Sequence, residues 1–205
     1  MLIAINPDNP QQRLINQVAE VLRNDGVIAY PTDTTYGIGC SIFSKKGIEK
    51  IYQLKQRDKK KPFSFICANL SEVSKYAQMS NIAFRQMKRL LPGPYTFVLE
   101  ATGIVPELVQ TKQKTVGIRI PDNKICLDLV TALGHPLITT SANHSGEEPI
   151  GDPRELFDCM KKQLDVVVDG GLLSPDVSSV VSMLNDIPTV LRKGIGEVSW
   201  CVGEL

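Results

Sequence analysis

The chain has 205 residues, of which 42% are hydrophobic and 22% are charged. This profile is typical of an ordinary globular domain and excludes a disordered, collagen-like or membrane-embedded chain. Lysine and arginine number 23 against 22 aspartate and glutamate residues, so the net charge of +1 provides no global argument for a nucleic-acid or membrane surface. We expect a single domain over residues 1–205.

Short apolar runs alternate with helical periodicity in the first half of the chain. Hydrophobic residues recur on one helical face over residues 14–22, and a second helix carries Lys55 at its C-terminal end. The predicted strands of this half are residues 2–5, 27–30 and 62–68. The predicted helix caps are Asn9, followed by Pro10 at the first helical position, and Ser44, Ser71 and Ser80.

The second half of the chain contains more strands than helices. Strands are predicted over residues 95–99, 115–120, 137–140, 166–168, 179–181 and 189–191, and helices over residues 124–133 and, after an Asp152 cap, 154–162. The last strands follow one another with only turns between them. The order is therefore mixed, and it predicts an α/β or α+β domain built on a mixed sheet.

The signatures of several common enzyme classes are missing. No G-x-G-x-x-G follows the first two strands and no G-x-x-x-x-G-K-[ST] occurs, which argues against dinucleotide oxidoreductases and P-loop enzymes. Only two histidines are present, Ser141 is not in a G-x-S-x-G elbow, and no metal site is indicated. The five scattered cysteines form no C-x-x-C pair, so we expect small core residues in a reducing, cytoplasmic protein without a signal peptide or membrane span.

The near-neutral total conceals a segregation of charge. Residues 45–124 carry 16 basic and 6 acidic side chains, a net charge of +10, and the rest of the chain carries 7 basic and 16 acidic side chains, a net charge of −9. The densest basic run comprises Lys55, Arg57 and Lys59 to Lys61. Such a run predicts either an anion-binding surface or the solvated end of a helix.

Three polar segments follow strand-like or helical runs, where α/β sheets place ligand sites. Residues 31–39 combine hydroxyls with two glycines, residues 55–61 combine a guanidinium with lysines, and residues 139–146 are rich in hydroxyls and amides. The first and third segments are equally typical of hairpins or turns without a ligand. The second suits phosphate oxygens, and it does not by itself distinguish ATP from RNA.

Two arginines interrupt apolar strands. Arg119 lies within the run of residues 116–120, and Arg192 follows Val190 and Leu191. A charge in such a run is costly unless the group is paired or faces a site. Both residues are thus candidates for ligand binding, with an ordinary edge or surface arginine as the alternative.

Taken together and in this order, these segments resemble the YrdC/YciO family. The resemblance rests on PTDTTYG (31–37), KQR (55–57), PGPYT (92–96), GIRIP (117–121), SANHSG (141–146) and LRKG (191–194), and it spans nearly the whole chain. The combination of Lys-x-Arg with Ser-x-Asn is its most specific mark. The opening residues 6–16 are most similar to the YciO branch.

The resemblance implies a twisted open sheet flanked by helices around a basic concave cavity. It also implies an L-threonylcarbamoyladenylate synthase, a nucleotidyltransferase that converts L-threonine, bicarbonate and ATP, with Mg²⁺, into threonylcarbamoyl-AMP and pyrophosphate. This reaction leads to the N6-threonylcarbamoyl modification of adenosine 37 in tRNA. Other tRNA-modification proteins are implied as partners, and a membrane is not.

The motifs assign roles to individual residues by resemblance. Lys55 and Arg57 would be catalytic. The nucleotide-binding residues would be Arg57, Lys61, Thr115, Ser141, Asn143 and Arg192, and the threonine-binding residues would be Thr34, Arg119, Thr139 and Ser178.

The chain departs from the family pattern at two places. Residues 63–66 read FSFI where synthases often have a histidine, and Glu147, Glu148 and Pro149 follow the SANHSG segment where another hydroxyl is common. These departures and the +10 segment leave an alternative open. It is a YciO-type paralogue that binds double-stranded RNA, tRNA or a nucleotide in the same cavity without efficient synthesis, and a domain that binds nothing is a third reading.

Overall fold

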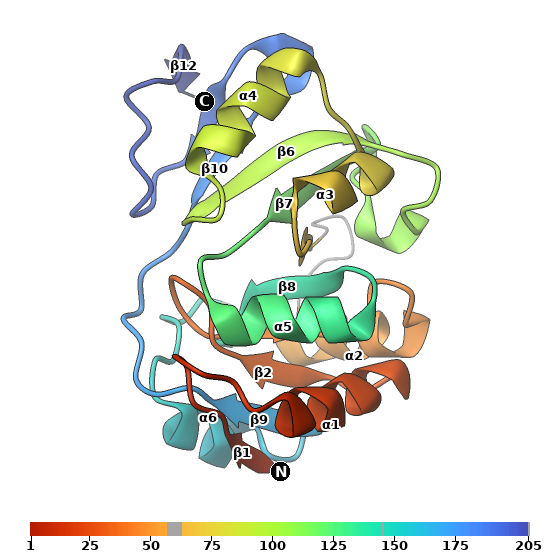
Figure 1. The fold of residues 1–205 in the computed structure, drawn as a ribbon, viewed down its shortest axis with the longest axis vertical. Coiled ribbons are helices and arrows are strands. Elements are labelled where there is room, and N and C mark those ends of the chain that lie inside the picture. Colours follow the sequence, from red (N-terminus) through yellow and green to blue (C-terminus); the bar gives the residue numbers. More distant parts are fainter. Residues whose placement is uncertain (57–62, 145, 205) are drawn as a thin grey trace.

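The computed structural model describes residues 1–56, 63–144 and 146–204, whose course is shown in Figure 1. Their strands form one mixed sheet in the order β1-β9-β2-β3-β8-β4-β7-β6-β10-β11-β12, with β5 paired to β6 outside this path. The strands are β1 (Leu2–Ala4), β2 (Ile28–Tyr30), β3 (Gly37–Gly39), β4 (Ser64–Ile66), β5 (Ala77–Gln78), β6 (Tyr95–Ala101), β7 (Thr115–Arg119), β8 (Leu137–Ser141), β9 (Val166–Asp169), β10 (Ser179–Ser182), β11 (Thr189–Arg192) and β12 (Gly203–Glu204).

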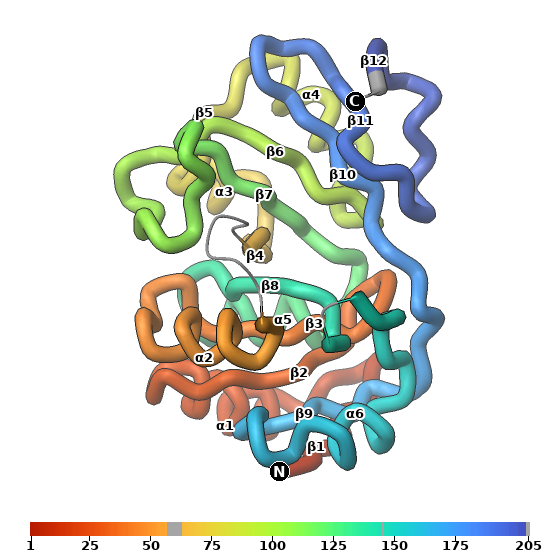
Figure 2. The backbone as a smooth tube through the Cα atoms, turned by 180° about the vertical axis from the view of Figure 1, so that it is seen from behind, coloured from red at the N-terminus to blue at the C-terminus, as the bar shows by residue number. Residues whose placement is uncertain are grey.

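Helices cover both faces of this sheet. They are α1 (Gln12–Arg23), α2 (Lys45–Lys55), α3 (Leu70–Tyr76), α4 (Asn81–Leu90), α5 (Lys124–Leu133) and α6 (Pro153–Met160), with two 3-10 turns at Glu107–Val109 and Leu184–Asp186. At the end of the sheet that holds β1, α1 and α5 lie on one face and α2 and α6 on the other, as Figures 1 and 2 show from opposite sides. The predicted mixed sheet flanked by helices is therefore confirmed.

The core has two parts, one on each face of the sheet. Ile15 and Leu22 of α1 and Leu129 of α5 are fully buried in the smaller part, and Ile51 of α2 and Leu156 of α6 lie in the larger part. Each such side chain stabilises the fold by about 1.5 to 3 kcal/mol relative to its exposed state. The apolar periodicity of the helices thus fixes which side of each helix meets the sheet.

Three of the predicted helix caps are confirmed. The side chains of Ser44, Ser80 and Asp152 each accept a hydrogen bond from a backbone N–H two or three residues later. These bonds satisfy donors that have no partner within the first helical turn.

The predicted caps Asn9 and Ser71 are wrong. The backbone N–H of Asn9 donates to the side chain of Asn6, so this segment forms a turn and α1 begins only at Gln12. Asn69, two residues before Ser71, caps α3 in its place. In both places a nearby asparagine side chain accepts backbone N–H hydrogen bonds and sets the local turn or helix start.

The short strand β3 lies inside the segment that we expected to form a ligand loop or turn. It pairs antiparallel with β2 and with β8. A Cβ atom at Gly39 would lie 2.0 Å from the carbonyl oxygen of Ile138 in β8, so only glycine fits between these backbones. A glycine-rich run that reads as a turn is here a central strand, because the neighbouring backbone comes very close.

One long connection joins the two ends of the sheet. After β9 the chain runs along one edge of the molecule as residues 170–178, which we call the connecting segment, and then enters β10 (Figures 1 and 2). β10 lies between β6 and β11, far along the sheet from β9. The connecting segment therefore crosses from the half that contains β1 to the half that contains β12.

The cysteine prediction is correct for only part of the set. Cys40, Cys67 and Cys126 are buried, whereas Cys159 is exposed and Cys201 is half-buried, and all five are free. Burial raises the pKa of the three buried thiols, which keeps them protonated and inert. None of the helices in the described ranges combines the length and apolar character that crossing a membrane requires.

Candidate functional site

A cavity of about 260 Å³ opens between the two halves of the sheet. Its floor comes from the loop that joins β2 to β3 and from β8, and its walls come from the ends of β7 and β11 and from the connecting segment. The residues that line it are mostly hydroxyl-bearing: Thr32, Thr34, Thr35, Tyr36, Gly37, Phe63, Ser64, Thr96, Arg119, Thr139, Thr140, Ser141, Val177, Ser178, Val180 and Arg192.

Arg119 forms a buried ion pair at one wall of the cavity. Its Nη2 lies 2.7 Å from Oδ1 of Asp33 and donates a second hydrogen bond to Oγ1 of Thr34 at 3.1 Å. Both charged side chains are less than a tenth exposed. Strand β7 thus delivers the guanidinium, and the 31–37 loop supplies the carboxylate that offsets its charge.

Burial raises the pKa of the Asp33 carboxyl, although Arg119 and the backbone N–H of Asp122 act in the opposite direction. Keeping the buried carboxylate ionised therefore lowers the stability of the fold, and the ion pair with Arg119 reduces this loss. A pair of this kind orients the guanidinium toward the cavity and is weak evidence for stability by itself.

Two buried polar atoms beside the cavity have no hydrogen-bond partner among the described residues. They are Oγ1 of Thr35 and Nε of Arg119. Their neighbour Thr32 is fully engaged, since its Oγ1 donates to the Thr35 carbonyl at 2.6 Å and contacts Oγ1 of Thr34 at 3.1 Å. Buried polar groups without partners are rare and costly, so these two atoms reduce the stability of the fold beside the cavity.

Replacing Thr35 with Val is expected to raise the free energy of unfolding of the free protein by about 1 kcal/mol, because it removes an unpaired buried hydroxyl without changing side-chain shape. Chemical denaturation measures this change. The matched control is Thr115→Val, whose hydroxyl is paired with Oγ1 of Thr111 at 2.7 Å and should cost about 1 kcal/mol. Equal losses in the two variants would show that Thr35 has a partner in the free protein.

The opposite wall is built around Ser178. Its Oγ lies 2.9 Å from Oγ1 of Thr96, and Nη2 of Arg192 donates to its carbonyl oxygen at 2.7 Å and to its Oγ at 3.1 Å. Burial lowers the pKa of the Arg192 guanidinium, and the positive charge of Arg119 lowers it further. The two arginines therefore repel each other across the cavity, an arrangement that an anionic ligand would stabilise.

Lys55 lies beneath the loop that follows β8. Its ammonium, at the C-terminal end of α2, donates to the carbonyl oxygens of Ser141 at 2.9 Å and Asn143 at 2.6 Å, and also to Oδ1 of Asn143. The side chain is almost fully buried. In this structure the hydrogen bonds of Lys55 stabilise the 141–143 loop. Its predicted catalytic role stays a prediction.

The structure brings most of the described site candidates together. Of the residues that we predicted, six line the cavity: Thr34, Arg119, Thr139, Ser141, Ser178 and Arg192. Lys55 and Asn143 lie behind this wall and support it. Arg57 and Lys61 lie outside the described residues.

Thr115 is not part of this wall. It begins β7, whereas Arg119 ends it, so the two residues are about 13 Å apart along the strand. Its hydroxyl is paired with Thr111. Its predicted role in nucleotide binding has no support in the geometry of the cavity.

Several lining residues received no individual role from the sequence. Thr35 and Tyr36 belong to the PTDTTYG motif, as does Asp33, the ion-pair partner of Arg119, and Thr96 belongs to PGPYT, so the motifs contain them. The sequence could not assign their roles, because only the fold shows that the side chains of Thr96 and Ser178 are in contact.

The acidic pair after the SANHSG motif stays outside the cavity. Glu147 and Glu148 are exposed and do not line it, and the contact that Asn143 makes here is with the backbone carbonyl of Glu147. Within residues 1–56, 63–144 and 146–204, no group of three or more His, Cys, Asp or Glu side chains could hold a metal ion.

The family and its members provide an independent comparison. The family model Sua5_yciO_yrdC, described as "Telomere recombination", matches residues 20–194. The Escherichia coli (strain K12) protein named "Uncharacterized protein YciO" is 45% identical over 196 residues, which cover 95% of each chain. The crystal structure of E. coli YciO has a TM-score of 0.93 at 43% identity and covers 97% of this chain and 98% of its own.

More distant relatives carry a named activity. A threonylcarbamoyl-AMP synthase of Vibrio vulnificus is 31% identical over 159 residues, covering 76% of this chain and 86% of its own. The crystal structure of P. abyssi Sua5 complexed with L-threonine has a TM-score of 0.89 at 26% identity and covers 95% of this chain and 57% of Sua5. The matched motifs, the shared fold and these identities lead to one conclusion: the chain belongs to the Sua5/YciO/YrdC family.

Proposed function

We propose that the protein is an L-threonylcarbamoyladenylate synthase acting in the threonylcarbamoyl modification of tRNA. The observation that carries the proposal is the arginine wall of the cavity, where the Arg119 guanidinium is oriented by Asp33 and Thr34 and lines the same space as Arg192. A guanidinium held in this way suits a carboxylate. The threonine-bound structure of Sua5, which shares this fold, supports threonine as the molecule whose carboxylate it meets.

The size of the cavity separates the two substrates. Its volume of about 260 Å³ is below the range of about 300 to 1,000 Å³ that is usual for small-molecule pockets. An amino acid fits within such a space, whereas a nucleotide would extend beyond it. ATP would then lie across the mouth, between Arg192 and the 141–143 loop.

The chemistry requires charge to be offset more than it requires a protein nucleophile. Threonine and bicarbonate condense to a carbamate with loss of water, and a carbamate oxygen attacks the α-phosphorus of ATP. The bond from phosphorus to the bridging oxygen breaks, and pyrophosphate leaves with the electron pair. Two anions must meet, so fixed cations and hydroxyl donors at the cavity lower the barrier by alignment and by electrostatic stabilisation.

Mg²⁺ fits this proposal as a companion of ATP. The described residues offer no cluster of ligands that would hold it alone. Magnesium commonly binds through substrate phosphates and few protein carboxylates, and it would supply charge neutralisation on the departing pyrophosphate.

Purified protein incubated with L-threonine, bicarbonate, Mg²⁺ and ATP is expected to release pyrophosphate only when threonine is present. Arg192→Ala should reduce this rate about 10- to 100-fold, because it removes a charged donor from the mouth of the cavity. Arg154→Ala, which alters an exposed arginine on α6, is the matched control and should leave the rate unchanged. Absence of threonine-dependent pyrophosphate at high enzyme concentration would refute the synthase proposal.

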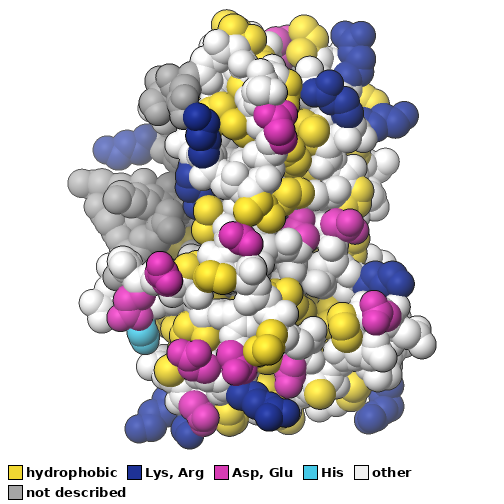
Figure 3. Space-filling model, turned by 90° about the vertical axis from the view of Figure 1, so that its left-hand side faces the viewer, with side chains coloured by type: hydrophobic (Ala, Val, Ile, Leu, Met, Phe, Trp, Pro, Cys, Tyr) yellow, Lys and Arg dark blue, Asp and Glu magenta, His cyan; other side chains and the backbone are white. Residues whose placement is uncertain are grey.

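A paralogue that binds RNA or a nucleotide without efficient synthesis is the second candidate. The hydrogen bonds of Lys55 favour this candidate. We predicted a catalytic role for its ammonium, but the ammonium donates to backbone carbonyls of the protein itself. On the face shown in Figure 3, however, the Lys and Arg side chains of the described residues are dispersed among acidic ones. If synthesis is absent, RNA binding that weakens steeply with salt would identify this alternative.

A further inference from the structure

The connecting segment is hydrogen-bonded near both ends, and its middle lacks hydrogen bonds to other described residues. Near its start, the N–H of Leu173 donates to the carbonyl of Gly151 at 3.0 Å, and near its end the N–H of Ile195 donates to the carbonyl of Val177 at 3.0 Å. Residues 174–176 are exposed and make no hydrogen bond within the described part of the chain. The two ends are therefore attached separately, the far end through Val177, Ser178 and the start of β10.

The far end forms part of the cavity. Val177 and Ser178 line it, and Ser178 is the residue that Arg192 and Thr96 contact. A shift of the connecting segment would consequently move a hydroxyl and the carbonyl that orients Arg192. Both groups belong to the wall opposite Arg119.

The near end is attached to the floor of the same cavity by Tyr36. Its hydroxyl donates to the carbonyl of Gly171 at 2.7 Å and accepts from the N–H of Gly170 at 3.1 Å. The tyrosine is fully buried, although it belongs to the 31–37 loop. One side chain of the PTDTTYG motif thus contacts the cavity and also fastens the segment that crosses it.

The chemistry of this attachment requires a phenol. The oxygen must donate one hydrogen bond and accept another, which a tyrosine does and a phenylalanine of nearly the same shape does not. Burial raises the pKa of the Tyr36 hydroxyl, so it keeps the proton that it donates to Gly171. The adjacent Gly171 has a φ of +95°, a conformation that favours glycine and allows the chain to leave β9 at this point.

We propose that Tyr36 is a positioning residue, which fastens the connecting segment to the 31–37 loop and thereby holds Ser178 and Arg192 in register with Arg119. The inference rests on the proposed function for its substrate, threonine, and on the structure alone for the attachment. Tyr36 lines the cavity, and its hydroxyl is engaged with Gly170 and Gly171 rather than directed at a ligand. The attachment would also keep the two walls, which come from opposite halves of the sheet, at a spacing at which both can contact one ligand.

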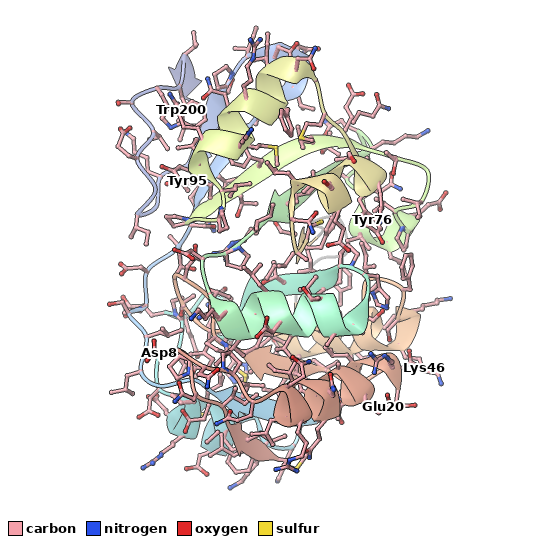
Figure 4. All side chains as sticks on the ribbon, in the orientation of Figure 1. Asp8, Glu20, Lys46, Tyr76, Tyr95 and Trp200 are labelled. Carbon is pink, nitrogen blue, oxygen red and sulfur yellow. The ribbon has the colours of Figure 1, made fainter. Side chains whose placement is uncertain are left out.

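The test compares Tyr36→Phe with Tyr95→Phe. The hydroxyl of Tyr95, in the upper part of the molecule in Figure 4, also donates to a backbone carbonyl, that of Glu197 at 3.0 Å, which lies outside the connecting segment. Hydrogen exchange of the amides of residues 170–178 is measured without any ligand, and threonine binding is measured by calorimetry. Tyr36→Phe should accelerate exchange in this segment about ten-fold or more and weaken threonine binding about ten-fold.

The two readouts distinguish the possible failures. Exchange in residues 170–178 that matches that of Tyr95→Phe would overturn the attachment, whatever the protein binds. Faster exchange with unchanged threonine affinity would overturn the positioning role. A wild-type protein that binds no threonine and releases no pyrophosphate would refute the proposed function and with it the role in threonine binding, whereas the exchange comparison would still decide the attachment.

Discussion

Replacing Arg119 with Met is expected to lower the free energy of unfolding by about 3 to 5 kcal/mol. The substitution leaves the Asp33 carboxylate, which is less than a tenth exposed, without its ion-pair partner. Burial already raises the pKa of this carboxyl with Arg119 present, so the unpaired carboxylate will either be destabilising or take up a proton. Urea denaturation of both proteins measures the difference.

A double variant separates stability from binding. Asp33→Asn combined with Arg119→Met removes the unpaired charge and should recover much of the lost stability, while threonine binding stays reduced about 10- to 100-fold. Lys161→Met breaks the exposed pair with Asp158 and should cost less than about 1 kcal/mol. A double variant that binds threonine as the wild type does would exclude Arg119 from the substrate site.

Replacing Lys55 with Met should cost about 2 to 4 kcal/mol of stability and abolish nucleotide binding. The change deprives two carbonyl oxygens and Oδ1 of Asn143 of a charged donor in a buried place. The 141–143 loop would then lose the conformation that presents Ser141 to the cavity. Thermal unfolding should show a fall in Tm of roughly 5 to 15 °C for a chain of this size.

The same helix offers a matched control for Lys55. Lys46 is strongly exposed, and its ammonium lies 3.8 Å from a carboxylate oxygen of Asp25, so Lys46→Met should change stability by less than about 0.5 kcal/mol. If Lys55 contacts phosphate directly and contributes little to the loop, Lys55→Met would keep its Tm and lose only affinity for ATP. A preserved Tm would therefore disprove the structural role.

The positions of the helices follow from local patterns, and the arrangement of the strands does not. The helix over residues 124–133 has the predicted bounds, because its apolar periodicity and its terminal Gly134 are both local signals. Strand β3 was not predicted, since its two glycines are unfavourable in strands, and Gly39 is explained only by the close backbone of β8. Close approach between distant segments has no signature in a single sequence.

The candidate site shows the same division. The motifs contain eight of the twelve polar residues that line the cavity, because hydroxyls and arginines in apolar runs are visible in the sequence. Which of them meet depends on the sheet order: Thr115 and Arg119 share a strand but lie at opposite ends of it, whereas Arg192 reaches Ser178 across fourteen residues. The sequence shows which residue types are present, but only the fold shows which of them lie next to one another.

The pairing of β1 also determines when the chain can complete its sheet during synthesis. β1 and β2 do not pair with each other, because β9 lies between them and binds both in parallel. Asp169 must therefore emerge from the ribosome before Ala4 can pair with it. By contrast, β2 and β3 are close in sequence and can pair as soon as both are synthesised. We expect the first strand to wait, unpaired, through most of translation, and a chain that stops before β9 to expose two hydrophobic strand edges to other nascent chains and to chaperones.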